Sequence, residues 1–456
     1  MTIASLSNTN GWGLAWPVQD TILVGAYTGL MAVPANGGAP AVIPTDTAGL
    51  TMGQRWPVGI PGTDAVLFVA GGNSAPNGRL AVLRRSTRRA EIFEVPAVAP
   101  LGVMRGQAVY VTGAGSVMAV PFDMHALRPT GSPIQVADDV IADFGNGAKA
   151  FVSSSGTLAY IQGHTDVQPV FALGAAAAPL ALDARAFGTP RFSPDGSRIA
   201  FSIAGGNVSD IWVYDMRTRT LSRLSTEGNN VRPEWAPDGR RIIYLSTRGE
   251  TQMIWSQPAD GSAPGEMLYR PTTEVYEALL SPDAKSLVLR TGSSLEHPRD
   301  IVMVPLEGNR QVVPVVAGPA FEMMPRISPN GKWIAYQSNE SGRMEIYVRP
   351  FPAAGARAQV TNDGGTEPIW SRDGRTLYYR TPAGGVAAVT VTAEAAFTFG
   401  SRRDVVTGDY VVDTSHPSYD VAPDGKILLL RRAGGDVKAI VVHNWARELA
   451  EKTAKR

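Results

Sequence analysis

Charged side chains of both signs stand at two fixed distances before a turn sequence that recurs in the second half of the chain. The first copy of the turn reads Ser193-Pro-Asp-Gly196. Two positions before the turn, in four copies, stand Arg191, Glu234, Arg326 and Asp420, and four positions before it, in three copies, stand Arg232, Glu277 and Glu367. Arginine binds carboxylates and other oxyanions through paired N–H donors, and carboxylates accept hydrogen bonds from cations and backbone amides. We predict that these residues line a channel where a polar ligand or partner binds; the alternative is that they pair with one another around a solvated pore.

No motif for catalysis accompanies these charges. Asp143-Phe-Gly145 spells the metal-binding triplet of kinases, but the sequence has neither their catalytic loop nor their glycine-rich phosphate loop. The sequence also lacks Gly-x-Ser-x-Gly, the nucleophile elbow of many serine hydrolases. It contains no cysteine, and its histidines stand singly, without metal-site spacing, at His125, His164, His297, His416 and His443. We therefore expect no catalytic residue, no metal and no cofactor.

The recurring turns carry an acidic residue that could suggest calcium loops. The residues at this position are Asp195, Asp238, Asp283, Asn330, Asp373 and Asp424. Each turn offers a single carboxylate, whereas a calcium loop needs several at Asp-x-Asp-x-Asp-Gly spacing. Asn330 has no charge, yet both Asn and Asp suit a turn with proline before and glycine after. We therefore predict that these residues shape the turns and bind no metal.

Short strands arranged in repeats carry all of these residues. An apolar strand lies on each side of every turn, and a second strand pair follows, as in Asp210–Asp215 and Thr220–Leu224 after the first copy. The turns stand roughly 45 residues apart, which is typical of a four-stranded propeller blade. Four weaker repeats precede residue 190, with turns near Asp20, Asp64, Gln107 and Gly156. The sequence predicts an all-β propeller of about ten four-stranded antiparallel blades.

The last repeat is incomplete, and this affects how the propeller closes. After Val437–Val442 the chain changes to the helical pattern Trp445–Lys452, while Thr2–Leu6 is a spare strand at the start. Because an unpaired sheet edge is unfavourable, we expect the spare strand to close a single ring of about ten blades. The alternative is a six-bladed ring from about Pro190 onward with a partial ring of four units before it. The predicted domains are the degenerate repeats 1–189, the clear repeats 190–443 and a short helical tail 444–456.

The repeat resembles that of a known family. Ser193-Pro-Asp-Gly, then Asp210-Ile-Trp-Val-Tyr-Asp215 and Arg223-Leu-Ser225, is similar to the repeat of the TolB-like, PD40-type propellers, a WD40-like group. From about Trp12 to Leu449 the chain resembles most closely the propeller region of bacterial serine/threonine protein kinases, without the kinase domain. The further motifs in the order of that family are Trp12-Gly-Leu-Ala-Trp16, Gln54-Arg-Trp-Pro57, Ala119-Val-Pro-Phe122, Val348-Arg-Pro-Phe-Pro352 and Val441-Val-His-Asn-Trp-Ala-Arg-Glu-Leu449. The resemblance implies a bacterial propeller whose channel senses a ligand.

Charge and hydropathy narrow the classes of partner. Lys and Arg number 42 against 41 Asp and Glu, so no overall field favours nucleic acid. The first residues lack the basic start and apolar run of a secretory signal, and no segment approaches the roughly 20 apolar residues of a membrane span. We therefore expect a cytoplasmic location, at the periphery of a membrane complex, with a periplasmic location as the alternative.

The absence of catalytic motifs and the predicted propeller together favour a binding function. Propellers bring loops from every blade onto two broad faces, which suits the binding of a protein partner. We expect a non-catalytic protein-binding or scaffolding subunit of a larger assembly. The alternative is a sensor that binds a small molecule or peptide in the channel, and an enzyme with a site built across blades is the least expected.

Overall fold

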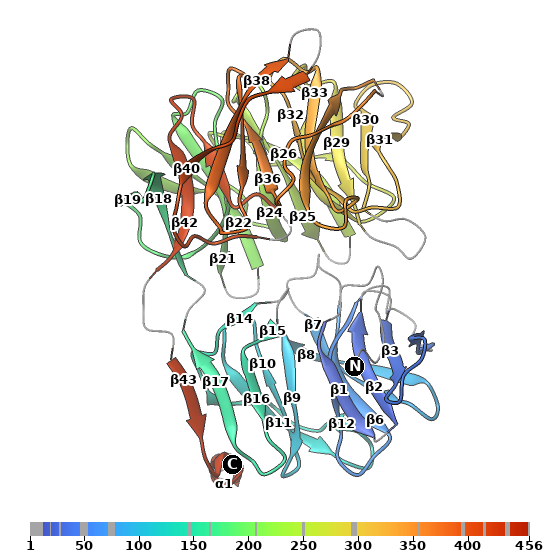
Figure 1. Cartoon of the computed structure of the whole chain (residues 1–456). Helices are drawn as coiled ribbons and strands as arrows, with labels where there is room; N and C mark the ends of the chain where they lie inside the picture. Colours follow the sequence, from blue (N-terminus) through green and yellow to red (C-terminus); the bar gives the residue numbers. More distant parts are fainter. Residues whose placement is uncertain are drawn as a thin grey trace. The chain divides into compact units, whose positions relative to one another are not determined.

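A computed structural model describes most of the chain. The described residues run from 12 to 454, except for residues 19, 27–28, 46–52, 72–77, 144–146, 164–165, 206–207, 249–250, 293–298, 354, 394–396, 414–415 and 434–437. The chain divides into two compact units: unit 1 is Met1–Thr165 with Gly434–Arg456, and unit 2 is Asp166–Ala433. Both are built almost entirely of short antiparallel strands, as the sequence predicts (Figure 1).

The strands of unit 2, within its described residues, form six antiparallel sheets. Five sheets use consecutive strands: β20 (Ala186–Phe192), β21 (Arg198–Gly205), β22 (Val208–Asp215) and β23 (Thr220–Arg223); β24 (Asn229–Trp235), β25 (Arg241–Arg248), β26 (Thr251–Pro258) and β27 (Glu266–Tyr269); β28 (Val275–Leu280), β29 (Ser286–Thr291), β30 (Ile301–Pro305) and β31 (Val313–Val316); β32 (Glu322–Ile327), β33 (Trp333–Ser338), β34 (Glu345–Pro350) and β35 (Ala358–Gln359); β36 (Thr366–Trp370), β37 (Thr376–Arg380), β38 (Val386–Ala393), β39 (Phe397–Phe399) and β40 (Arg403–Val406). The sixth is ordered β41 (Tyr419–Val421), β42 (Ile427–Arg432), β18 (Val167–Leu173) and β19 (Ala176–Pro179).

These sheets close into a ring, which we call the ring of unit 2. The first strand of each sheet contacts the neighbouring sheet in turn, and β41 contacts β20. Apolar side chains seal the closing contact, where Leu428 and Leu430 of β42 share a buried cluster with Ile199 and Phe201 of β21. The sixth sheet is thus held to the first by a core as well as by its position in the ring.

Unit 1 contains the other repeats. Its strands are β1 (Leu14–Val18), β2 (Thr21–Ala26), β3 (Gly29–Pro34), β4 (Ala41–Val42), β5 (Gln54–Gly59), β6 (Ala65–Ala70), β7 (Gly78–Arg84), β8 (Arg89–Ala97), β9 (Ala99–Met104), β10 (Gln107–Val111), β11 (Val117–Asp123), β12 (Arg128–Pro129), β13 (Ile134–Ala137), β14 (Ala142–Asp143), β15 (Gly147–Ala148), β16 (Ala150–Val152), β17 (Leu158–Gln162) and β43 (Lys438–Val442). The first two repeats share one sheet through the pair Ala26 and Gln54. The sheet β16–β17–β43 is followed by α1 (Trp445–Ala454), the one helix among the described residues.

The fourth and tenth repeats exchange strands. Strand β42 pairs with β18 from Val167 opposite Arg432 to Ala172 opposite Ile427, and β17 pairs with β43 from Leu158 opposite Val442 to Gln162 opposite Lys438. In Figure 1, β18 in green lies beside β42 in red. Each repeat therefore supplies its inner strands to one unit and its outer strands to the other.

This exchange corrects the expected single ring of about ten blades. The edge of β42 next to which the repeat's own third strand, Val437–Val442, was expected is occupied by β18, β43 pairs with β17 instead, and the sheets divide between two units. Thr2–Leu6 itself lies outside the described residues. The six-bladed alternative describes unit 2, except that its ring begins with β18 and not near Pro190. The division into degenerate repeats 1–189, clear repeats 190–443 and a tail 444–456 describes the repeats and stays a prediction.

The recurring turns are held by their acidic or amide side chain. In each copy the residue at that position, Asp195, Asp238, Asp283, Asn330, Asp373 or Asp424, accepts a hydrogen bond from the backbone N–H two residues ahead. In the first copy the Ser193 hydroxyl also donates to Asp195 at 2.5 Å, which lowers the pKa of this carboxyl to about 2. Gly196 then takes a φ of +73°, a backbone conformation that glycine adopts without strain. The observed bonds are those of an Asx turn.

The strand exchange predicts which fragment of the chain folds independently. We expect residues 166–433 to fold alone into a cooperatively unfolding all-β domain, because every sheet of the ring is complete within these bounds. The comparison fragment 190–443, cut at the repeat boundary, lacks β18, β19 and the first four residues of β20, and it leaves β42 without β18 at its edge. We expect it to aggregate or to unfold at least about 10 °C lower. Circular dichroism during thermal unfolding measures both, and equal stability of the two fragments would contradict the exchange.

Candidate functional site

Backbone bulges place the predicted channel residues at the inner strands of the ring. Pairing shifts register just before the turn in β20, β24, β32 and β36. At these shifts Thr189, Arg232, Met324 and Glu367 have φ between +42° and +61°, which is rare for residues other than glycine. In each case a proline follows, and proline has no N–H to lose from the interrupted ladder. Bulges of this kind redirect side chains near functional sites.

The innermost strand of each sheet contributes at least one of the predicted charges. Arg191 lies on β20, Arg232 and Glu234 on β24, Glu277 on β28, Arg326 on β32, Glu367 on β36 and Asp420 on β41. Except for Arg232 and Glu234, which are half-buried, all of them are buried. Their charges consequently depend on partners within the protein, because burial removes most of the water that would otherwise solvate them.

Glu234 joins two arginines from different sheets. Its Oε1 accepts from Arg191 Nε at 2.7 Å and lies 3.0 Å from an Arg326 guanidinium nitrogen. Burial alone would lower the pKa of Arg191, but Glu234 and Asp420 outweigh it and raise that pKa. For Arg326, burial and the nearby charge of Arg191 outweigh the attraction of Glu234, Glu277 and Asp420, and its pKa is lowered.

The other carboxylates connect neighbouring inner strands. Glu277 Oε2 lies 2.8 Å from Arg290 Nε and accepts from the Met324 amide at 3.0 Å. Asp420 accepts from the Phe192 amide at 2.7 Å, across the closing contact of the ring. These bonds tie the predicted charges to the backbone of the next strand as well as to one another.

Among the predicted acids, Glu367 is the least accessible to solvent. Its carboxylate accepts from the backbone amide of Ser418 at 2.7 Å and lies 3.6 Å from Arg380 Nε. Burial raises the pKa of Glu367 to about 7, although Arg380 acts in the opposite direction. This acid therefore changes its protonation state near neutral pH without contact with solvent.

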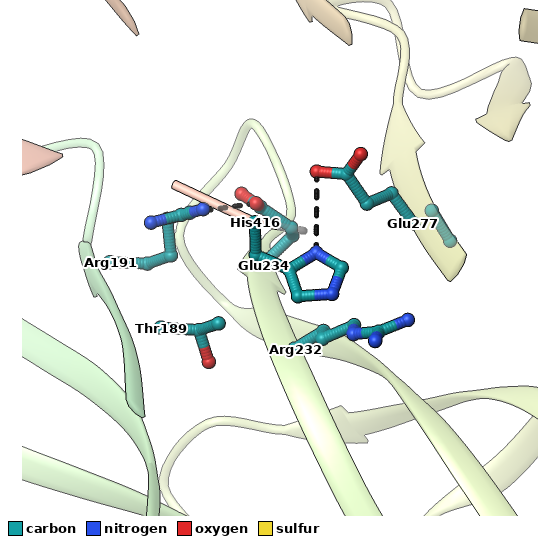
Figure 2. A pocket seen from close by; sticks show the side chains of 7 residues that line it. Thr189, Arg191, Arg232, Glu234, Glu277 and His416 are labelled. Carbon is teal, nitrogen blue, oxygen red and sulfur yellow. Dashed lines mark hydrogen bonds and ion pairs between the residues drawn. The ribbon is translucent and has the colours of Figure 1, made fainter. Parts of the chain in front are cut away.

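A small pocket lies at the inner end of three sheets and the segment before β41 (Figure 2). Its lining residues are Thr189, Arg191, Arg232, Glu234, Glu277, Ala278 and His416. The pocket thus brings together four of the predicted residues, whereas Arg326, Glu367 and Asp420 do not line it. Its volume is about 10 Å³, which is roughly room for one water molecule.

His416, like Thr189 and Ala278, is a lining residue that the sequence did not predict for this site. It stood as one of several isolated histidines, and only the fold brings it beside Arg232 and Glu277. Of the other histidines, His125 and His443 are exposed, while His164 and His297 lie outside the described residues. The sequence does contain a signal for the bulges: a proline follows each bulge residue that has a positive φ. These prolines are Pro190, Pro233, Pro325 and Pro368.

The sequence motifs with catalytic associations form no site within the described part of the chain. Asp143 ends β14, and Phe144 and Gly145 lie outside the described residues. Among the residues that are described, no group of three or more His, Cys, Asp or Glu side chains could hold a metal ion. Arginines, carboxylates and one histidine around a water-sized pocket are suited to hold a small polar or charged group.

Comparison with known proteins supports the predicted repeat family over part of the chain. Residues 158–306 match the family model for the TolB beta propeller domain, PD40. The chain is 29% identical over 156 residues to the Tol-Pal system protein TolB of Francisella tularensis subsp. mediasiatica, covering 34% of this chain and 35% of that protein. It is 24% identical over 192 residues to the uncharacterized peptidase YuxL of Bacillus subtilis, covering 33% of this chain and 29% of the relative. The chain therefore spans about a third of the length of these relatives.

Solved structures of similar proteins include further TolB proteins. A putative TolB from Agrobacterium tumefaciens has a TM-score of 0.44 at 15% identity, covering 58% of this chain and 98% of that one. TolB from Acinetobacter baumannii has a TM-score of 0.41 at 15% identity, covering 73% and 80%. The match to the family model alone shows that the repeats within residues 158–306 are similar to TolB-type propeller repeats.

The shared carboxylate of Glu234 predicts a strong effect of its removal. In Glu234→Gln two buried arginines lose their common counter-ion, and we expect the free energy of unfolding to fall by about 3 kcal/mol. Glu266→Gln is the matched control, since Glu266 is exposed and pairs with Arg241 at the surface; it should cost less than about 1 kcal/mol. Urea denaturation measures both changes, and equal effects would show that the buried pairs contribute no more than surface pairs.

The raised pKa of Glu367 predicts a specific pH dependence of stability. The folded chain holds this proton up to about pH 7, whereas the unfolded chain releases it near the ordinary glutamate pKa. Stability should therefore fall as pH rises between these two values and then stay level. Glu367→Gln should remove a fall of about 2–3 kcal/mol between pH 5 and pH 8. Parallel urea curves for wild type and variant at both pH values would contradict the burial of a protonated acid.

Proposed function

We propose that the chain is a non-catalytic, protein-binding subunit of a larger assembly, and that one face of the sheet β16–β17–β43 binds the partner. Three residues lie side by side across this sheet, since Phe151 pairs with Ala159 and Ala159 pairs with Val441. Directly paired residues of antiparallel strands point to the same face. Phe151 is 61% exposed and Val441 is 55% exposed. We call this row, with Ile161 and Ala439 beside it, the apolar face.

The exposure of the apolar face carries the proposal. The opposite side of the same sheet packs against α1. Leu158 lies in a buried cluster with Trp445 and Leu449 of α1, and Tyr160 packs against this cluster. Single exposed apolar side chains are ordinary, but a contiguous row of them marks a surface that a partner covers. The complementary partner is a protein segment that presents apolar side chains to a flat sheet.

The name of one relative also supports a role within an assembly of proteins. One relative is named a protein of the Tol-Pal system, and that name refers to a system of several proteins. Another relative is named a peptidase, and an enzymatic role is therefore the alternative to the proposed binding role. We favour the binding role because the described channel charges pair with one another and with backbone groups, an arrangement that holds the strands in place.

The expected membrane association belongs to this proposal. No helix among the described residues is long and apolar enough to cross a bilayer. We propose that the chain associates with its assembly through the apolar face, at the periphery of a membrane complex. The cytoplasmic location and its periplasmic alternative both remain predictions.

Substitutions in the apolar face test the proposed function. In extract from the native host, we expect the wild-type chain to migrate with a partner in size-exclusion chromatography under mild detergent. Phe151→Ser with Val441→Thr should abolish this comigration and leave the melting temperature within about 2 °C, because both side chains are exposed.

The matched control is Leu173→Ser, which removes an exposed apolar side chain of unit 2. It should leave the comigration unchanged. Migration of the wild type as a lone chain of 48.4 kDa, or equal loss in the control, would contradict the proposal.

A further inference from the structure

Arg232 carries a positive charge that is not ion-paired to any carboxylate among the described residues. Its guanidinium donates to the Tyr276 carbonyl and lies over the Tyr276 ring, with 5.3 Å from Cζ to the ring centroid. No ion pair joins it to a carboxylate among the described residues, although the charges of Asp413 and Glu277 attract it. Burial and the nearby Arg290 lower the pKa of Arg232 to about 10.

The acids that line the same pocket are already paired. Glu234 is shared by Arg191 and Arg326, and Glu277 is bound to Arg290. Both acids that line the pocket are therefore engaged by other arginines, and neither forms an ion pair with Arg232. A further positive ion would be repelled from this position, whereas a negative one would offset the unpaired charge.

His416 supplies a second, independent feature of the pocket. Its side chain is 6% exposed, and neither ring nitrogen has a hydrogen-bond partner within the described chain. Nδ1 lies 3.6 Å from Glu277 Oε1, which is too long for a hydrogen bond. Buried polar groups without partners are costly, so such a group in a native fold calls for a ligand or water.

The protonation state of His416 suits a donor to an anion. Burial, followed by the charges of Arg232 and Arg290, lowers the pKa of this imidazole well below its usual value. At neutral pH the ring is therefore uncharged, with one N–H donor and one acceptor nitrogen. Figure 2 shows the ring within the hollow, next to the Arg232 guanidinium.

We propose that this pocket binds a small monovalent anion, chloride or one oxygen of a carboxylate, between the Arg232 guanidinium and the His416 ring. The volume of about 10 Å³ admits a single water-sized atom and excludes a whole sulfate or phosphate. The anion offsets the charge of Arg232 and accepts the N–H of His416. This site lies in unit 2, so the anion proposal can be tested independently of the partner binding proposed for the apolar face of unit 1.

The reference salt is sodium isethionate, whose tetrahedral sulfonate is bulkier than chloride or a planar carboxylate. In the test it is replaced by chloride or formate at constant ionic strength. Each anion should raise the melting temperature of the full chain, by about 3 °C at ten times its dissociation constant. The chain should also broaden the NMR line of chloride, and formate should reverse the broadening if both occupy the same site. A response to formate alone would assign the site to a carboxylate, and a response to chloride alone would assign it to the halide.

Variants connect the response to the pocket. Arg232→Gln and His416→Phe should each lose the anion-dependent shift and the line broadening. Arg240→Gln removes an exposed arginine from the turn between β24 and β25 and should keep both. Without the anion, Arg232→Gln should melt no lower than wild type, because it removes a half-buried charge that has no ion pair, and this also shows that the variant folds. The absence of any shift in wild type, or an equal shift in Arg232→Gln, would overturn the proposal.

Discussion

Strand β42 pairs along its whole length with β18, a strand that lies far before it in the sequence, and the ring of unit 2 depends on this pairing. An unpaired edge would leave a row of N–H and C=O groups without partners, and β18 supplies them. The pairing also holds β41 beside β20, where the Asp420 carboxylate accepts a hydrogen bond from the Phe192 backbone N–H. His416, just before β41, owes its place in the pocket to the same closure. The exchange of strands between two repeats is therefore the condition for the site as well as for the fold.

The charges inside the ring follow from the cost of burying them. A carboxylate or guanidinium removed from water is tolerated when it is paired and hydrogen-bonded. Glu234 satisfies this with two arginines, Glu277 with one arginine and a backbone amide, and Asp420 with a backbone amide. Arg372, which replaces the proline of the fifth turn, donates to the Phe192 carbonyl at 3.0 Å. Such polar bonds are directional and fix the inner strands in a way that apolar packing alone does not.

Local patterns in the sequence predict the parts of this structure that depend on local interactions. The Ser-Pro-Asp-Gly turns predict the hairpins, and their spacing predicts the inner strands and the charges on them, because a turn and its flanking strands form within a few residues. The partner of β42 could not be predicted in this way, since periodicity counts repeats but does not say which strands of distant repeats pair. His416 was missed for a similar reason: its neighbours Arg232 and Glu277 come from other sheets, and a lone histidine carries no spacing signal.

The strand exchange also makes both candidate surfaces depend on late steps of folding. The pairs Val170 with Leu429 and Tyr160 with Ile440 join residues that are far apart in the chain, so their closure costs more loop entropy than any hairpin. Contacts of this range form slowly compared with local ones. One continuous segment, from His416 to Val442, completes the pocket, closes the ring through β42 and supplies β43 to the apolar face. A chain that stops before this segment can form most hairpins, yet it has neither the pocket nor the face, because each needs a strand that only the last repeat provides.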